Sequence, residues 1–177
     1  MSATLTLITC TRNPDPNSFR RVLAGVAALE RPADHDIEYL VIDSTSEPPV
    51  ASREAVREFL GRSPWARVIR SPAPGLAAAR RAGIEASKGA LIVWFDDDNV
   101  PAPDYLAHVV RTAAERPTVS VWGAGAIDVE FTSPVPAWAE HPADASISAT
   151  IRSAKTNRRF LDPRSAPTPG NLSSFPA

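Results

Sequence analysis

Three consecutive aspartates, residues 96–98, follow the most hydrophobic run of the chain, residues 90–95. Side chains alternate between the two faces of an extended backbone, so we expect Asp96 and Asp98 to project together and Asp97 to turn away. Asp96 and Asp98 then offer hard oxygen ligands to one Mg²⁺ or Mn²⁺. Acids after a strand can also cap a helix, but three adjacent like charges repel one another unless a cation or a donor-rich ligand compensates them. The triplet therefore predicts a divalent-metal site for a phosphate-bearing ligand.

Composition and charge limit the number of domains and exclude one class of partner. The 177 residues are 44% hydrophobic, which suffices for one full core but not for two complete domains. The formal charge is −1, and acids and bases are mixed along the chain. This pattern lacks the basic footprint of a nucleic-acid binder, so we expect no nucleic-acid partner.

Cysteine usage and hydropathy indicate the compartment. The single cysteine, Cys10, excludes an internal disulfide and a thiolate zinc cluster, and it fits a reducing environment. We find neither a signal-peptide pattern nor an apolar run approaching the roughly 20 residues of a membrane span. We therefore expect a cytoplasmic protein without a transmembrane segment, and peripheral association with a membrane stays open.

The hydrophobic pattern predicts strands that alternate with helices up to about residue 117. Short apolar or β-branched runs predict strands at residues 4–9, 37–43, 66–70 and 90–95. Apolar residues at helical spacing predict helices after an Asn17 cap, weakly at residues 52–60, at residues 75–87, and from about 103 to 115. This alternation predicts an α/β fold with a mainly parallel sheet and helices on both faces.

The helix expected at residues 75–87 is rich in alanine. Leu76, Ala79, Gly83 and Ile84 recur along one face, which we expect to be buried. Gly89 follows closely and is the expected C-terminal cap.

The regular pattern of apolar residues ends after about residue 119. Residues 132–177 hold seven of the 18 prolines and show no sustained period, so we expect an irregular, proline-rich segment that is mostly loop. The aromatic residues Trp122, Phe131 and Trp138 either form an exposed patch that favours self-association or pack under this tail.

Polar residues follow the ends of several predicted strands. Thr9 ends the first strand, and Thr11 and Asn13 follow it. Asp43 ends the second, and the aspartate triplet follows the fourth. Ligands of parallel α/β sheets bind at the carboxyl ends of the strands, so we expect these residues to converge on one site.

Four blocks in this order carry a family resemblance: Leu5–Asn13, Val41–Ser46, Pro74–Ile84 and Leu91–Asp98. Together they resemble the catalytic domain of family-2-like glycosyltransferases, over most of residues 4–131. The resemblance implies the Rossmann-like GT-A fold with an Asp-x-Asp motif. It implies a nucleotide-sugar-binding domain at residues 1–131 and a partial acceptor-side segment at 132–177, shortened at the C-terminus.

The resemblance also implies roles for the polar residues. The nucleotide base and ribose are then lined by residues of the first loop: Thr9, Thr11, Arg12 and Asn13. Asp43 resembles the acid that bonds the base, although an aspartate here can simply form a turn with Ser44. Arg80 resembles the residue that reaches the base or the diphosphate, and its alternative is a solvated helix arginine.

The aspartate triplet resembles the Asp-x-Asp motif that binds the metal. Asp98 resembles the direct ligand of Mn²⁺ or Mg²⁺. Asp96 and Asp97 resemble residues that contact the ribose or reach the metal through water, and Asp96 is also the second candidate ligand.

The implied activity is metal-assisted transfer of a sugar from a nucleotide diphospho-sugar to an acceptor hydroxyl, with inversion as the family's usual outcome. A UDP-sugar is the first expectation for the donor, and the acceptor can be a glycan, a lipid or a protein. The catalytic base stays unassigned. Glu140, Asp144 and Asp162 are carboxylates in the appropriate part of the chain, but their settings are those of ordinary loop acids.

Two other functions stay open at this point. A shortened transferase could bind a nucleotide sugar without catalysing transfer. An Mg²⁺-dependent phosphatase of the haloacid dehalogenase type also places acids after a hydrophobic strand. The phosphatase motif usually follows the first strand, whereas here the triplet follows about 90 residues of α/β structure.

Overall fold

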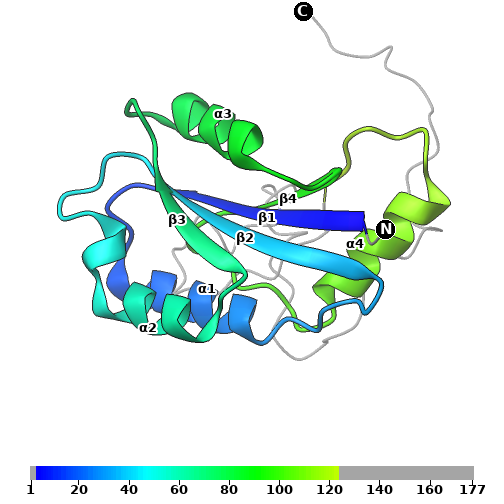
Figure 1. Cartoon of the computed structure of the whole chain (residues 1–177), viewed down its shortest axis with the longest axis horizontal. Coiled ribbons are helices and arrows are strands. Elements are labelled where there is room, and N and C mark those ends of the chain that lie inside the picture. Colours follow the sequence, from blue (N-terminus) through cyan, green and yellow to red (C-terminus); the bar gives the residue numbers. More distant parts are fainter. Residues whose placement is uncertain (1–2, 124–177) are drawn as a thin grey trace, which may run out of the picture. The chain divides into compact units, whose positions relative to one another are not determined.

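The computed structural model describes residues 3–123, and a compact unit within it ends at Thr112. The elements are β1 (Ala3–Thr11), α1 (Pro16–Ala27), β2 (His35–Asp43), a 3₁₀ turn η1 (Val50–Ser52), α2 (Glu54–Arg62), β3 (Ala66–Arg70), α3 (Leu76–Ala86), β4 (Leu91–Phe95) and α4 (Tyr105–Glu115). Within this part of the chain, four strands form one sheet in the order β3-β2-β1-β4, and every neighbouring pair is parallel. The expected α/β class is confirmed (Figure 1).

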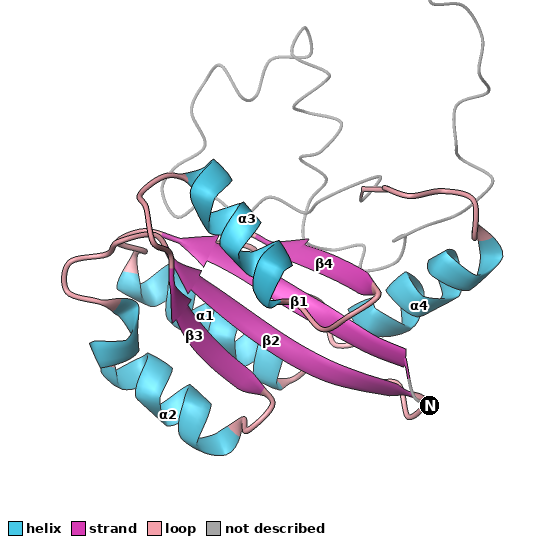
Figure 2. Ribbon diagram, turned by 45° about the horizontal axis from the view of Figure 1, so that its top comes forward, coloured by secondary structure: helices cyan, strands magenta, loops and turns pink. Residues whose placement is uncertain are grey.

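Alternate residues of β1 supply the cores on the two faces of the sheet. Leu5 and Leu7 pack with α1, α2 and α4, whereas Ile8 packs with Ala79 of α3. A strand covered by helices on both sides must be apolar on both faces, which explains the continuous apolar runs. Figure 2 shows α3 across one face of the sheet and α1 and α2 across the other.

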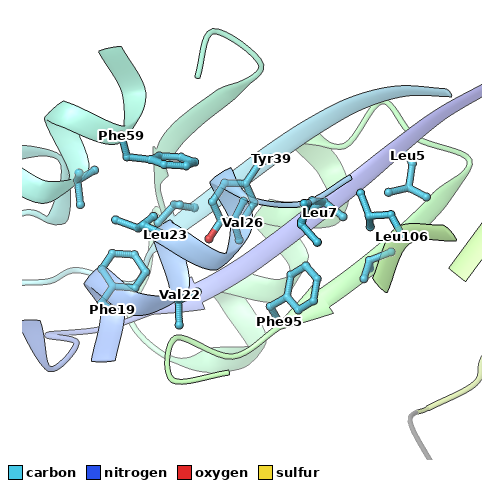
Figure 3. Close-up of a cluster of buried hydrophobic side chains, with 14 of the residues drawn as sticks. Leu5, Leu7, Phe19, Val22, Leu23, Val26, Tyr39, Phe59, Phe95 and Leu106 are labelled. Carbon is cyan, nitrogen blue, oxygen red and sulfur yellow. The ribbon is translucent and has the colours of Figure 1, made fainter. Parts of the chain in front are cut away.

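The larger core reaches the carboxyl end of the sheet through its aromatic residues (Figure 3). Tyr39 of β2 is fully buried and meets Phe59 of α2 edge to face, with 5.8 Å between ring centroids. Phe95, the last residue of β4, packs against Tyr105 of α4, with 5.3 Å between the ring centroids. Each such buried ring contributes roughly 2 to 3 kcal/mol. The β4 terminus is therefore firmly held where the aspartate triplet begins.

Helix α1 begins two residues earlier than expected. Asp15, not Asn17, is the cap, because its Oδ1 accepts hydrogen bonds from the backbone N–H of Asn17 at 3.1 Å and of Ser18 at 2.8 Å. Pro16 occupies the first turn, where its ring presets a helical φ and its missing N–H costs nothing.

The expected buried face of α3 is wrong in part. Ala79 and Gly83 are buried, but Leu76 and Ile84 are each 54% exposed. A Cβ at Gly83 would lie 3.0 Å from Ile8 Cγ2, so only small residues let α3 approach the sheet. The larger side chains are turned outward as a result.

Gly89 is not the C-terminal cap of α3. The helix ends at Ala86 with Ser87 in an extended conformation. A Cβ at Gly89 would lie 2.5 Å from Thr6 Oγ1 and 2.7 Å from the Thr6 backbone nitrogen. Glycine is needed here because the chain passes against β1 before it enters β4.

Several expectations concern residues 124–177 and lie outside the described residues. They include the proline-rich segment and the side chains of Phe131, Trp138, Glu140, Asp144 and Asp162. Within residues 3–123, no helix has both the length and the hydropathy of a membrane span.

Candidate functional site

The carboxyl ends of the strands meet along one edge of the sheet. Thr11 of β1 lies opposite Asp43 of β2, and Asp43 lies opposite Arg70 of β3. Phe95 of β4 lies opposite Thr9, so the triplet begins beside the end of β1. The strand β1 continues to Thr11, two residues further than its apolar pattern predicts, because the ladder with β2 extends to this row.

The aspartate triplet lies in a turn, not in an extended segment. β4 ends at Phe95, and the Asn99 N–H donates to the Asp96 carbonyl at 3.2 Å. The strand alternation assumed for the three side chains therefore does not apply. Asp97 is nonetheless the residue set apart: it is half-buried and accepts a hydrogen bond from Thr11 Oγ1, while Asp96 and Asp98 are exposed.

The chemistry of the exposed pair fits a metal shared with a ligand. Residues 3–123 contain no group of three or more His, Cys, Asp or Glu side chains arranged to hold an ion. Mg²⁺ commonly takes one or two carboxylates and completes its shell with water and substrate phosphates. Asp96 and Asp98 can supply that smaller share, and a diphosphate would supply more oxygen ligands.

Asp43 is occupied by its own loop. Its side chain is 1% exposed. Oδ1 accepts from the Ser46 N–H at 2.8 Å, Oδ2 accepts from the Val50 N–H at 3.1 Å, and Arg70 Nη1 lies 3.7 Å from Oδ2. The carboxylate thus shapes the loop after β2. The sequence offered a turn with Ser44 as one alternative for Asp43, but the hydrogen bonds are to Ser46 and Val50.

Asn13 joins the loop after β1 to the loop after β2. Its backbone N–H donates to Ser46 Oγ at 2.9 Å, and its Oδ1 accepts from the Glu47 N–H at 2.9 Å. Its φ of 49° lies in the left-handed region, which asparagine tolerates better than most residues. Arg12 is exposed.

Ser44 connects β2 to the loop that precedes α3. Its Oγ accepts from the Gly75 N–H at 2.9 Å. Gly75 has a φ of 106°, a conformation that side chains rarely adopt. The bond sets where α3 begins and therefore where Arg80, one turn further on, projects.

Cys10 lies on the face of the sheet covered by α3, and the charges of Arg80 and Asp96 both act on it. The Arg80 guanidinium carbon is 5.8 Å from the centroid of the Trp94 ring, within cation–π range. Burial raises the pKa of the Cys10 thiol to about 11; the Arg80 charge opposes this shift and the Asp96 charge adds to it. The thiol is therefore protonated at neutral pH.

Thr9 lies beneath the site. It is fully buried, and its Oγ1 accepts a hydrogen bond from the Tyr39 hydroxyl at 2.9 Å. Burial raises the pKa of Tyr39 far above its ordinary value, and the negative charge of Asp97 adds to the effect. Asp97 and Asp96 thus act on opposite faces of the sheet.

Some residues that shape this edge were missed from the sequence. Arg70 contacts Asp43 and also pairs with Glu47 at 3.0 Å, so it ties β3 to the loop after β2. Applying the strand-end rule to β3 as well as to the other strands would have found Arg70. Nothing in the sequence pattern identified Cys10 or Ser46, because their partners come from other loops and helices.

Comparison with protein families and curated proteins yields two matches. The model of glycosyl transferase family 2 matches residues 6–168. The putative glycosyltransferase EpsH of Bacillus subtilis (strain 168) is 32% identical over 100 residues, which are 56% of this chain and 28% of EpsH.

Solved structures share the fold. The mannosyltransferase PcManGT from Pyrobaculum calidifontis, in complex with GDP-Man and Mn²⁺, aligns with a TM-score of 0.56 at 24% identity, covering 74% of this chain and 36% of that protein. Residues 1–349 of S. aureus TarS, also solved with UDP, align with a TM-score of 0.56 at 15% identity, covering 75% and 38% respectively. The chain thus spans less than two fifths of the length of each of these relatives.

Proposed function

Because the chain belongs to glycosyl transferase family 2, we propose that it moves a sugar from a nucleoside diphosphate donor to an acceptor hydroxyl. Its parallel sheet has the GT-A-like arrangement that the solved relatives share. The observation that carries the proposal is the turn after β4, where Asp96 and Asp98 are exposed at the carboxyl edge while Asp97 is held aside by Thr11.

Asp96 and Asp98 would hold a divalent cation together with the two phosphates of the donor. A bound Mn²⁺ or Mg²⁺ neutralises the negative charge that develops on a leaving nucleoside diphosphate. PcManGT, a structural relative, was solved with Mn²⁺, which supports this choice of ion.

Within residues 3–123, Arg80 is a cation placed to assist. Its guanidinium is held by the Trp94 ring, and its charge acts on Cys10, as the charge of Asp96 does. A guanidinium can donate two parallel hydrogen bonds to phosphate oxygens. Arg80 would therefore bind the diphosphate from the side opposite Asp97 and help orient it.

The donor nucleotide is proposed to be UDP, with GDP as the competitor to test. TarS was solved with UDP and PcManGT with GDP-Man. Inversion at the sugar requires a carboxylate base on the acceptor side. The candidates for that base are Glu140, Asp144 and Asp162. The acceptor is proposed to be a glycan, a lipid or a protein.

Calorimetric titration with UDP and with GDP, each with Mn²⁺, tests the proposal. We expect binding by the wild type and a loss of binding in Asp98→Ala. Asp36→Ala is the matched control, because Asp36 is exposed at the opposite end of the sheet, where it pairs in register with Thr4. Indifference to both nucleotides would overturn the proposal.

A turnover assay separates the remaining alternatives. Release of the nucleoside diphosphate from a panel of nucleotide sugars supports transfer or donor hydrolysis. Binding without release from any sugar identifies a donor-binding module. Release of phosphate from simple monoesters identifies a phosphatase.

A further inference from the structure

We propose that Thr11 is a positioning residue whose hydroxyl anchors Asp97, so that Asp96 and Asp98 alone are presented to the ligand. This assigns Thr11 and Asp97 a supporting role in place of direct contact with the nucleotide. Its consequence for binding rests on the proposed function, whereas the anchor itself does not.

Thr11 and Asp97 meet just beyond the last backbone pair of β1 and β4. The β1–β4 ladder ends at the pair Thr9 and Phe95. Two residues further along each segment, Thr11 Oγ1 donates to Asp97 Oδ2. The side chains therefore extend the attachment of β4 to β1 beyond the last backbone pair.

The anchor is rigid because Thr11 belongs to the sheet. Thr11 is 3% exposed and pairs in register with Asp43 on its other side. Its backbone carbonyl also accepts the Ser44 N–H at 2.8 Å. A hydrogen bond from a fixed hydroxyl to a carboxylate is a charge-assisted one, stronger than a neutral pair.

The anchor divides the triplet between the two faces of the sheet. Asp97 is bonded to Thr11, and its charge acts on the buried Tyr39, whereas the charge of Asp96 acts on Cys10. Three adjacent carboxylates repel one another, and a free turn could rotate any of them outward. Because Thr11 holds Asp97, Asp96 and Asp98 are the two carboxylates that stay exposed to a ligand.

Titration of Mn²⁺ with UDP in a double-mutant cycle tests this assignment. We expect Thr11→Val to weaken binding about tenfold, the usual effect of losing a hydrogen bond to a charged group. In the Asp97→Ala background the same substitution should add nothing, because its partner is already gone. Thr11→Ser, which keeps the hydroxyl, should restore binding.

Additive losses in the double variant would show that Thr11 contacts the nucleotide directly, and unchanged binding in Thr11→Val would show that the anchor has no effect. Either result overturns the proposal. Thr4→Val is the matched control, because Thr4 lies at the other end of β1. Thermal unfolding of each variant identifies any loss of folding.

Hydrogen exchange of the nucleotide-free protein separates this proposal from the proposed function. The amides of residues 97–99 should exchange faster in Thr11→Val than in the wild type or in Thr4→Val. Equal exchange overturns the anchor even if UDP binds. Faster exchange in a protein that binds neither UDP nor GDP keeps the anchor and overturns only the proposed function.

Discussion

The loop after β2 and the turn after β4 both place aspartates at the carboxyl edge of the sheet, but the two environments are opposite. Asp43 is 1% exposed and each of its oxygens accepts a backbone N–H. Asp96 and Asp98 are exposed. A carboxylate that satisfies buried donors stabilises the fold, whereas one left in solvent is free to bind a cation.

The same contrast separates the four aspartates from one another. Asp97 resembles Asp43 more than its own neighbours, since it is half-buried and bonded to Thr11. Adjacent residues of identical type therefore have different environments, and the partner of each carboxylate decides which. The following substitutions are ordered by the size of the expected effect.

Asp43→Ala should lower the free energy of unfolding by about 3 kcal/mol, because it leaves two buried N–H groups without a partner. Asp43→Asn should lose less, since its amide oxygen can still accept one of them. Urea unfolding followed by circular dichroism measures both. A loss below about 1 kcal/mol for Asp43→Ala would remove the contrast between the two regions.

Asp98→Ala should show the reverse pattern. Its free energy of unfolding should change by no more than about 0.5 kcal/mol, as for other exposed positions. Its affinity for UDP with Mn²⁺ should fall at least about tenfold, which is 1.4 kcal/mol. A large stability loss with intact nucleotide binding would assign Asp98 to the structural class of Asp43.

Gly75→Ala tests the loop after β2, because Gly75 is bonded to Ser44 of that loop. The Gly75 φ of 106° strains any side chain, so we expect a loss of about 1 to 2 kcal/mol even though no atom lies within 4 Å of the new Cβ. Gly61→Ala in α2 is the control, because that Cβ is also in open space but the backbone is helical. Gly61→Ala should be neutral or stabilising.

The reactivity of the Cys10 thiol tests the turn after β4, because the charge of Asp96 contributes to the Cys10 pKa. Because its pKa is raised to about 11, alkylation by iodoacetamide should be slow at neutral pH and accelerate as the pH rises toward that value. Asp96→Asn removes a negative charge that raises the pKa, so the thiolate fraction and the alkylation rate should increase. An unchanged rate would place the Asp96 carboxylate away from the α3 face.

Local patterns were sufficient for the order and type of the elements. Apolar runs located all four described strands, and residues 66–70 were predicted with the observed bounds. The strand-end rule correctly brought Thr11, Asp43 and the triplet to one edge. These features depend on near neighbours in the chain and on the general behaviour of parallel sheets.

Predictions failed where a residue's partner is distant in the chain. The large side chains of α3 were expected to be buried, but the close approach to Ile8 admits only Ala79 and Gly83. Gly89 was interpreted as a helix cap, although its environment is set by Thr6, 83 residues away. Periodicity contains no information about such packing distances.

The sequence by itself determined that this is an α/β protein with acidic residues at the carboxyl ends of its strands. Only the tertiary structure decided which partner each acid has there. Thr11 and Asp97 are 86 residues apart, and Asp43 is satisfied by a loop whose course depends on three strands. Hydrogen bonds act over about 3 Å, so the assignment follows from which groups the fold brings that close.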